Sequence, residues 1–362
     1  MTTPAQRIII PKPNTFRTVF LFVGQGEATL HIAPDGRGGF KYILVDMNHS
    51  EKLRSVDVVA LLEDLLPRQN GRPTLDMFIN THPHNDHLGG IGDLRKRVNV
   101  REVWHTGFRP SQKHDDAYGE LQSLMNDVSR AGGNIVEYRG TREECRIGEV
   151  TYNVLSPADH TKEEIDDLDG EARDKRIHDY CGVLRFRYGA PPRHVMITGD
   201  ADKSAWQDFI LGQAEYQAER LPCTILSAGH HGSRSFFKEG EDDENPYTRH
   251  LELMAPDWLV ISSPKQADSP HGHPHDDAIA LYKNQLDADH IRVLGERPEC
   301  IVYDVTVDGF DLLDSDGGEL IEAYPTGGED AGDSGSEIAA PYVATTSRID
   351  SGRPMGELRD ID

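Results

Sequence analysis

The chain has few cysteines, no long apolar run and a shortage of positive charge. Its four cysteines, Cys145, Cys181, Cys223 and Cys300, are widely separated and form no Cys-x-x-Cys pair. This spacing argues against a disulfide framework and against a thiolate zinc site. No apolar segment approaches the roughly 20 residues needed to cross a bilayer. The first residues also lack the pattern of a secretory signal. We therefore expect a cytoplasmic protein that has no membrane partner.

The shortage of positive charge bears on the substrate. The chain has 38 Lys and Arg residues against 62 Asp and Glu residues, a formal net charge of -24. Such an excess repels phosphate backbones at long range. A phosphodiester substrate would need local cations, and bound metal ions are the obvious source. The same charge would also fit a solubility device or an adaptation to salt, and composition does not separate these readings.

What the chain has instead is length and a mixture of strand and helix patterns. It has 362 residues, 37% of them hydrophobic, which is enough for a large core. Apolar and β-branched runs predict strands at 18–23, 28–32, 42–46, 75–80, 100–104, 150–155, 182–187, 194–198, 224–227 and 258–261. Apolar positions at helical spacing predict helices at 55–66, 89–97, 117–130, 203–211 and 275–287. Because strands follow one another early and again at 150–198, we expect an α/β fold with a four-layer αββα sandwich rather than one doubly wound sheet.

Two segments differ from the rest in composition. Residues 161–176 are almost all charged, which predicts a solvated helix or loop inserted between strands. From about Asp314 onward, Gly, Asp, Glu, Ser and Thr dominate. We therefore expect one domain over residues 1–324, followed by an acidic, Gly/Ser/Asp-rich flexible tail over 325–362.

The strongest chemical signal is the segment Thr81–Gly90, which follows a short buried strand. It places four possible metal ligands, His82, His84, Asp86 and His87, within six residues. Imidazole and carboxylate suit zinc, manganese or iron, and no thiolate selects zinc alone. In an irregular loop the first two ligands can point to one metal and the last two to a second metal nearby. A polar loop with surplus histidines is the alternative, but it does not explain this spacing.

The segment matches the HxHxDH motif and so resembles the metallo-β-lactamase fold superfamily. Three further stretches fall in the order of that family: Tyr42–Asp46 with its strand-closing Asp, Ile197–Asp200, and Ala228–Ser233 with its histidine pair. The resemblance implies the αββα fold and metal-dependent hydrolysis. It also implies two divalent metal ions, zinc or manganese, as cofactors.

The resemblance further implies a set of metal ligands. These are His82, His84, Asp86, His87, His178, Asp200 as the bridging residue, and His230. The family requires one histidine between the HxHxDH loop and the bridging Asp, and the candidates are His105, His114, His160, His178 and His194. We favour His178 because it stands just before the strand predicted at 182–187, with His160 and His105 as the alternatives.

Three residues are expected to take part in the reaction itself, by acting on the attacking water or on the leaving group. Asp86 would orient the attacking water and carry its proton, and His231 and His273 would donate to oxygen or protonate the leaving group. Ser233 and His273 are expected to contact substrate, although Ser233 would serve equally well as a helix cap. The two histidines that flank His273 are expected at the surface.

A narrower resemblance concerns Val23–Ala28, the His-His-Gly-Ser stretch at 230–233 and Gly272–Pro274. Together they resemble the hydrolase domain of the ComEC/Rec2 competence proteins and its stand-alone relatives. This implies a phosphodiesterase or nuclease that uses a metal-bridging hydroxide on a nucleic acid or nucleotide. The chain departs from that branch at Phe22, where an Asp is common, and it lacks the membrane segments, so DNA uptake is not implied.

Two other functions remain open at this point. The same ligands serve esterases, lactonases and lactamases, so a small-molecule hydrolase is one alternative. A non-catalytic binding module that kept the fold is the other. The sequence does not indicate an oligomeric state.

Overall fold

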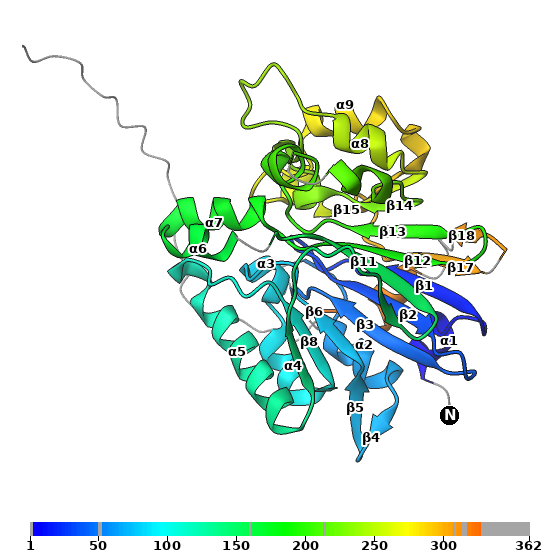
Figure 1. Cartoon of the computed structure of the whole chain (residues 1–362). Coiled ribbons are helices and arrows are strands. Elements are labelled where there is room, and N and C mark those ends of the chain that lie inside the picture. Colours follow the sequence, from blue (N-terminus) through cyan, green and yellow to red (C-terminus); the bar gives the residue numbers. More distant parts are fainter. Residues whose placement is uncertain are drawn as a thin grey trace, which may run out of the picture. The chain divides into compact units, whose positions relative to one another are not determined.

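The centre of the structure, a computed structural model, consists of two β-sheets packed face to face (Figure 1). The structure describes residues 3–49, 53–158, 161–212, 215–306, 308–312 and 317–326. The first sheet has eight strands in the order β18-β17-β1-β2-β3-β6-β8-β9. Their bounds are β1 Thr15–Phe20, β2 Thr29–Pro34, β3 Phe40–Val45, β6 Met77–Ile79, β8 Glu102–His105, β9 Asn134–Glu137, β17 Ile301–Thr306 and β18 Phe310–Leu312.

The second sheet has seven strands in sequence order, β10 to β16. Their bounds are β10 Cys145–Ile147, β11 Val150–Ser156, β12 Val183–Tyr188, β13 Arg193–Ile197, β14 Ile225–Ser227, β15 Trp258–Pro264 and β16 Ile291–Gly295. Aromatic rings pack between the two sheets. The ring centroids of Phe16 on β1 and Phe186 on β12 are 6.3 Å apart, and those of Trp104 on β8 and Tyr152 on β11 are 5.6 Å apart. A small third sheet contains β4 Arg68–Gln69, β5 Arg72–Leu75 and β7 Asn99–Val100.

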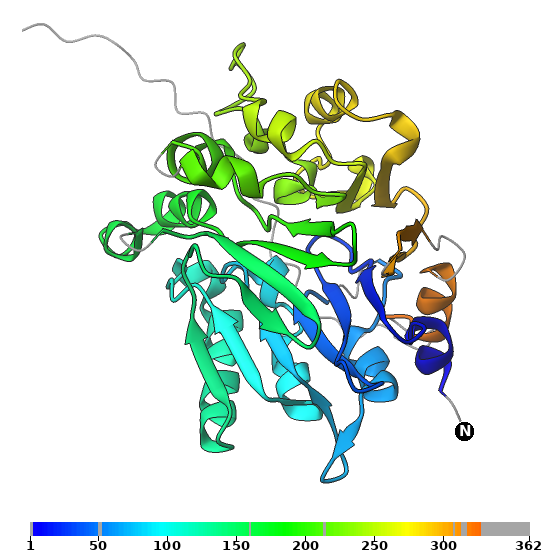
Figure 2. The ribbon, with the colours of Figure 1, turned by 45° about the vertical axis from the view of Figure 1, so that its right-hand side comes forward.

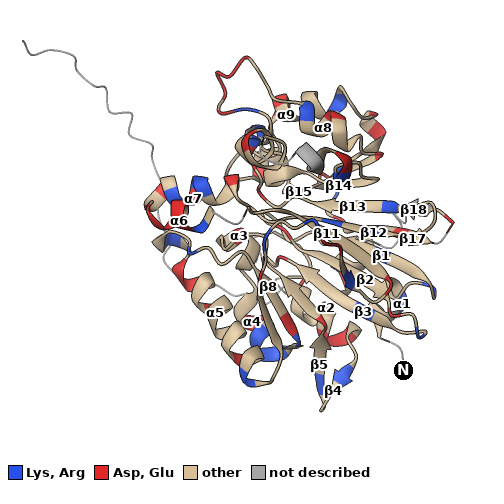
Figure 3. Ribbon diagram, viewed as in Figure 1, with Lys and Arg blue, Asp and Glu red and all other residues tan. Residues whose placement is uncertain are grey.

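Helices cover the outer face of each sheet (Figures 1 and 2). Beside the first sheet lie α1 Pro4–Ile9, α2 Val58–Leu65, α4 Ile91–Arg97, α5 Asp115–Arg130 and α10 Gly317–Ala323. Beside the second lie α8 Arg249–Met254, α9 Asp276–Lys283 and the π-helical stretch η2 Ala205–Ile210. Charged residues gather on helices and loops, while the central strands are largely uncharged (Figure 3). The expected four-layer αββα sandwich is confirmed.

Burial explains why these segments form strands. All six residues of β1 and all six of β2 are buried, because each strand has one face toward the second sheet and the other toward a helix layer. Such strands show apolar runs rather than alternation. The strand predicted at 18–23 is shifted, since β1 ends at Phe20 and the next three residues form a buried loop.

The remaining expectations differ mainly at element ends. The helix expected at 89–97 is α4, which begins at Ile91 and follows a separate short helix, α3 (Asn85–Leu88); the helix expected at 203–211 is π-helical. The charged stretch 161–176 forms α6 (Thr161–Asp166) and most of α7 (Gly170–Asp179). Most of that stretch is solvated, as expected, but Asp174 is buried.

The predicted tail lies largely outside the described residues. Its first two residues are attached to the body: Pro325 pairs with Val56, and Thr326 Oγ1 accepts a hydrogen bond from the Ser55 N–H at 3.0 Å. The boundary at 324/325 therefore stays a prediction. The candidate ligand His160 also lies outside the described residues. In the part of the chain that is described, no helix has the length and hydropathy of a membrane span.

The strand directions gather several loops at one edge of the sandwich. β3 and β6 are parallel in the first sheet, and β13, β14 and β15 are parallel in the second. Parallel strands place their carboxyl ends together, and in α/β proteins ligands bind at that end. The HxHxDH loop follows β6, Asp200 follows β13 and the histidine pair follows β14.

Candidate metal centre

A first group of side chains comes from the loop after β6 and from the last turn of α7. His82, His84 and His178 each turn a ligand atom toward a common point, and these atoms lie within 4.8 Å of one another. The His178 Nε2 and His84 Nδ1 atoms are 2.9 Å apart, and the rings of His82 and His84 are 4.5 Å apart. Among the candidates for the intermediate histidine, the structure therefore brings His178 into this group, while His114 stacks on the outer side of His84.

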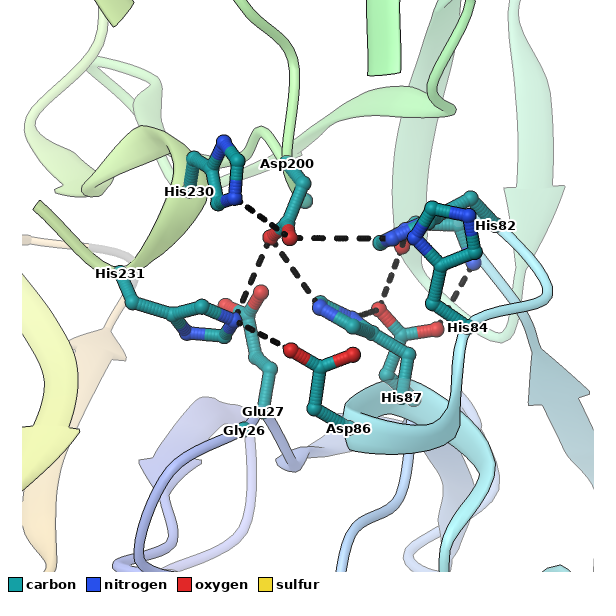
Figure 4. Close-up of polar contacts among 12 residues, drawn as sticks. Gly26, Glu27, His82, His84, Asp86, His87, Asp200, His230 and His231 are labelled. Atoms are coloured by element: carbon teal, nitrogen blue, oxygen red, sulfur yellow. Dashed lines mark hydrogen bonds and ion pairs between the residues drawn. The ribbon is translucent and has the colours of Figure 1, made fainter. Parts of the chain in front are cut away.

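A second group lies beside the first and draws on α3 and the loop after β14. It contains Asp86, His87, Asp200 and His231, again with ligand atoms within 4.8 Å of one another (Figure 4). The His231 Nε2 atom is 3.4 Å from an oxygen of Asp86 and 3.4 Å from Asp200 Oδ1. The His87 Nε2 atom is 3.1 Å from the same oxygen of Asp200.

Asp200 lies between the two groups. Its Oδ1 faces His87 and His231, whereas its Oδ2 lies 3.7 Å from His82 Nε2 and 3.9 Å from His178 Nε2. Burial alone would raise the pKa of Asp200, but the nearby His231 and His87 hold it well below its usual value. The carboxylate is thus ionised and offers one oxygen to each group.

Gly199 allows Asp200 to reach this position. Its φ is +48°, and a Cβ on it would lie 2.6 Å from Cys181 Sγ and 2.7 Å from Thr81 Oγ1. A side chain at this position would therefore push β13 away from the HxHxDH loop. The turn works only with glycine.

The buried ligand atoms lack hydrogen-bond partners. Nε2 of His82, His87 and His231 and Oδ1 of Asp200 are all buried and make no hydrogen bond. Such atoms are rare because leaving a buried polar atom without a partner costs roughly 1–3 kcal/mol. A cation would use these lone pairs, and a donor set of nitrogen and oxygen without thiolate suits zinc, manganese or iron. The residues therefore fit a metal centre.

Hydrogen bonds behind the ligands fix which ring nitrogen is free. The Nδ1–H of His87 donates to Asp46 Oδ2 at 2.7 Å, and that of His231 donates to the Ser262 carbonyl at 2.9 Å. Because a carbonyl oxygen can only accept, the His231 proton lies on Nδ1 and its Nε2 lone pair faces the group. Asp46, at the end of β3, also accepts from the Thr81 N–H at 2.7 Å. Such outer hydrogen bonds are typical of metal-binding histidines.

His230 lies at the edge of the centre. Its Nδ1 is 2.9 Å from Asp202 Oδ1 and 2.9 Å from Ser235 Oγ, while its Nε2 is 3.5 Å from Asp200 Oδ2. Burial would lower the pKa of His230, but Asp200 and Asp202 raise it to about 9. About a fifth of its side chain is exposed, and it lines the cavity described below.

The structure brings both members of the histidine pair to the centre. His231, expected on the substrate side, belongs to the second ligand group, and His230, expected as a ligand, forms a further candidate group with His178 and Asp200. Both residues have left-handed backbones, with φ of 48° and 55°. Non-glycine residues rarely adopt this conformation, and such strain is concentrated at functional sites. Here the strain directs two adjacent rings to different sides of Asp200 (Figure 4).

A cavity of about 530 Å³ opens over the two groups. Every side chain that lines it is polar: Gln25, His84, Asn85, Asp86, Lys113, His114, Asp174, His178, Asp200, His230, His231, His271 and His273. His273 is present as expected, with burial and the neighbouring His230 and His231 lowering its pKa to about 2. His271 is exposed, as expected, and it also lines the mouth of the cavity.

Ser233 does not line this cavity. Its hydroxyl accepts a hydrogen bond from the Ser235 N–H at 3.2 Å and caps the short helix η5 (Arg234–Phe236). The expected contact of Ser233 with substrate is therefore not supported, and the capping alternative accounts for its position. His105 also lies apart from the site, since its Nδ1 accepts a hydrogen bond from the Gly107 N–H at 3.1 Å.

Several residues at the site were not found from the sequence. Gln25 had a signal, because it belongs to the Val23–Ala28 motif, and Gly26 in that motif packs where a Cβ would lie 2.4 Å from the Asp86 carbonyl oxygen. Asp202 follows Asp200 by two residues. Asp174 had no signal, because it lies within a charged stretch typical of a solvated helix.

The comparison with protein families agrees with this geometry. Residues 59–237 match the family model described as Metallo-beta-lactamase superfamily. The fold is that of the metallo-β-lactamase superfamily. The matched region contains the HxHxDH loop, His178, Asp200 and the histidine pair. No curated protein sequence matches the chain.

Solved structures, one of them described as a metallo-β-lactamase fold protein, resemble the chain at low sequence identity. The fold protein YhfI from Bacillus subtilis is 14% identical with a TM-score of 0.45, over 80% of this chain and 100% of its own. A diphosphatase from the PhnP family is 12% identical with a TM-score of 0.40, over 81% of this chain and 99% of its own. Zn²⁺-bound PqqB from Methylobacterium extorquens is 11% identical with a TM-score of 0.40, over 76% and 97%.

Proposed function

We propose that this chain is a dinuclear metal-dependent phosphodiesterase whose substrate is a nucleic acid or a nucleotide. The observation that carries the proposal is the lining of the cavity, which is polar throughout and rich in hydrogen-bond donors. Sites for neutral small molecules are lined mostly by apolar and aromatic side chains. Of the cavity's three carboxylates, Asp86 and Asp200 belong to the ligand groups and Asp174 is paired with Lys113. The remaining histidines, amides and one lysine suit an anionic, strongly hydrated substrate.

We assign His82, His84 and His178 to one ion and Asp86, His87 and His231 to the other. Asp200 is assigned to both. This differs from the sequence expectation in one position, since His231 replaces His230 as the last ligand. Two divalent ions bound there would lower the pKa of a shared water and offset charge on the phosphoryl oxygens. Zinc and manganese both suit this set of donors.

The chain's own side chains then complete the reaction. His230 is held through Nδ1 by Asp202 and directs Nε2 into the cavity, where it can give its proton to the leaving oxygen. Asp86 lies beside the second group and can take up the proton of the attacking water. His273 and Gln25, whose Nδ1 and Nε2 atoms are 3.5 Å apart, can donate to a phosphoryl oxygen.

Lys113 supplies the positive charge that the rest of the cavity lacks. Of the described residues that line the cavity, it is the only Lys or Arg. Its ammonium group is 3.0 Å from Asp174, and its side chain is 60% exposed. It can therefore turn toward a second anionic group of the substrate. A dinucleotide or an oligonucleotide has such a group next to the cleaved phosphodiester.

The narrower resemblance to the ComEC/Rec2 hydrolase domain supports the same substrate class. Gln25 and His273 belong to the first and last motifs of that resemblance, at opposite ends of the sequence, and they lie side by side in the cavity. Two motif residues that are neither buried core nor metal ligand thus point to one substrate-binding region.

The formal charge of -24 favours a second candidate, a hydrolase for a neutral or cationic ester, lactone or lactam. Both candidates are tested with one protein preparation loaded with Zn²⁺ or Mn²⁺. Phosphodiesterase activity on bis(p-nitrophenyl) phosphate, single-stranded DNA and cyclic and linear dinucleotides supports the proposal. Turnover of lactones or a chromogenic cephalosporin with no phosphodiester cleavage would support the second candidate. Metal binding without turnover of either panel would indicate a binding module.

A further inference from the structure

A buried carboxylate on α7 lies behind the first ligand group. Asp174 is 4% exposed. Its Oδ1 accepts a hydrogen bond from the Ser111 N–H at 3.0 Å, and its Oδ2 accepts one from the Ser111 hydroxyl at 2.7 Å. The Lys113 ammonium lies 3.0 Å from Oδ2. The two hydrogen bonds from Ser111 hold the carboxylate beside the short helix η1 (Gln112–His114), which precedes α5.

Two imidazole rings face this carboxylate from one side. The His84 Nε2 atom is 3.4 Å from Asp174 Oδ1, and the His114 Nε2 atom is 3.7 Å from Asp174 Oδ2. The two rings are stacked, with centroids 4.2 Å apart and planes 13° apart. Both Nε2 atoms are buried without a hydrogen bond in the described structure. The three side chains therefore form a buried cluster with a shared centre.

Hydrogen bonding assigns the protons in this cluster. The backbone N–H of Asn85 donates to His114 Nδ1 at 3.1 Å, so the proton of a neutral His114 ring lies on Nε2, toward Asp174. His84 turns Nδ1 toward His178, 2.9 Å from its Nε2, and so toward the first ligand group. A ring that offers its lone pair at Nδ1 must carry its proton on Nε2, which again faces Asp174.

We propose that Asp174 and His114 are positioning residues for the first metal site, an inference that rests on the proposed function. Asp174 holds the proton of His84 on Nε2 and so keeps the Nδ1 lone pair free for the metal. The stacked ring of His114 fixes the plane of the His84 ring. The helix pair α6–α7 between β11 and β12 therefore contributes both a ligand, His178, and the support of another.

A third metal ion in this cluster is a less suitable explanation. The Lys113 ammonium and the Ser111 hydroxyl already approach Asp174 Oδ2, and the Ser111 N–H approaches Oδ1. A cation would have to displace an ammonium group and compete with two hydrogen bonds. The cluster is therefore suited to hold a ring in place rather than to bind an ion.

The effect of this support is confined to one of the two sites. Removing a carboxylate that orients a metal-bound histidine typically lowers metal affinity by about 10- to 100-fold. In the second group, His87 is held by Asp46 and His231 by the Ser262 carbonyl, and neither contact involves α7. Loss of Asp174 should therefore lower the binding affinity for one ion and leave the affinity for the other unchanged.

The test is a Zn²⁺ titration of the metal-free chain against a competing chelator. Asp174→Ala, which removes the acceptor that faces His84, is compared with Asp169→Ala, which removes the same charge from an exposed N-cap residue that makes no capping hydrogen bond. We expect Asp174→Ala to bind one ion normally and the other about 10- to 100-fold more weakly, with Asp169→Ala like the parent. Equal binding of both ions by a folded Asp174→Ala would overturn the proposal.

A second variant covers the case in which Asp174→Ala fails to fold. His114→Phe retains the stacked ring but removes both nitrogens, so we expect the affinity of the same site to fall by a smaller factor, on the order of 10-fold or less. Unchanged affinity of both ions in this variant would contradict a role for His114. A parent chain that binds three ions, one of which is lost in Asp174→Ala, would also overturn the proposal. A parent that binds no ion refutes the proposed function itself.

Discussion

Asp46→Asn is the substitution whose consequence can be worked out atom by atom. Asp46 Oδ1 accepts from the Thr81 N–H at 2.7 Å and from the Asn80 side-chain amide at 3.1 Å. Both of these groups can only donate at those atoms, so the amide oxygen of an asparagine must take the Oδ1 position. Its amide nitrogen then takes the Oδ2 position, which lies 2.7 Å from His87 Nδ1.

This exchange moves the ring proton of His87 from Nδ1 to Nε2. An amide N–H directed at Nδ1 requires that nitrogen to accept, so the ring proton moves to Nε2. The Nε2 atom is the one that faces Asp200 and Asp86 in the second ligand group, and once protonated it no longer binds a metal. We expect the second ion to bind at least about 10- to 100-fold more weakly. The lost charge-assisted hydrogen bond should also lower the free energy of unfolding by about 1.5–3 kcal/mol.

The assay combines Zn²⁺ titration with NMR of the imidazole nitrogens. In the metal-free parent, we expect the proton of His87 on Nδ1, and in Asp46→Asn on Nε2. Asp35→Asn, at a half-buried residue in the turn after β2, serves as the matched control; its oxygen can still accept from the Arg37 and Gly39 N–H groups, and the change should affect neither readout. A folded Asp46→Asn chain that keeps both ions at parental affinity, with the His87 proton still on Nδ1, would refute this reasoning.

Three further predictions concern the histidine pair, the cavity lysine and a buried glutamate. His231→Ala should reduce bound zinc from two ions to one per chain, whereas His230→Ala should keep both ions and lower kcat about 100-fold. Metal analysis and steady-state kinetics of both variants check this. The reverse pattern would show that His230 is the ligand, as the sequence suggested. Lys113→Ala should raise KM for a dinucleotide about tenfold and leave the turnover of a neutral ester unchanged, and an equal effect on both substrates would exclude a contact with an anionic group. Burial, partly offset by His87, raises the pKa of Glu27 from 4.5 to about 7, so its carboxyl favours the folded state in the neutral form. That contribution is complete below pH 4.5 and is lost as pH rises through about 7. Metal-free Glu27→Gln should therefore be more stable to unfolding than the parent by about 3 kcal/mol near pH 8 and equally stable near pH 4. Denaturant titrations that show the same pH dependence of stability in both chains would contradict this.

Local pattern was sufficient for the central strands of both sheets and insufficient at their edges. The edge strands β9, β10, β16, β17 and β18 and the helices α1, α8 and α10 were not predicted. In β17, Asp304 interrupts the apolar run, and a charged residue there argues against a buried strand. The structure shows that Arg17 on β1 pairs with Asp304 through Nε at 2.6 Å and Nη2 at 2.7 Å. The residue that makes the strand compatible with burial lies 287 positions away, so no local pattern contains it.

The metal loop could be predicted because its ligands lie within six residues and their spacing states the chemistry directly. The order of His230 and His231 could not be predicted, because adjacent side chains are directed by the backbone and both residues are left-handed. Asp174 could not be predicted either. A charged stretch indicates a solvated helix, and only the packing of α7 against η1 turns one of its carboxylates inward.

The central claim is that two ions bind at one edge of the sandwich, with Asp200 between them and His231 as the last ligand. A crystal of the Zn²⁺-loaded chain, measured at the zinc absorption edge, tests it directly. We predict two anomalous peaks on either side of Asp200, one of them about 2.0–2.1 Å from His231 Nε2, with His230 bound to neither. A single peak, no peak, or a peak ligated by His230 in place of His231 would contradict the account.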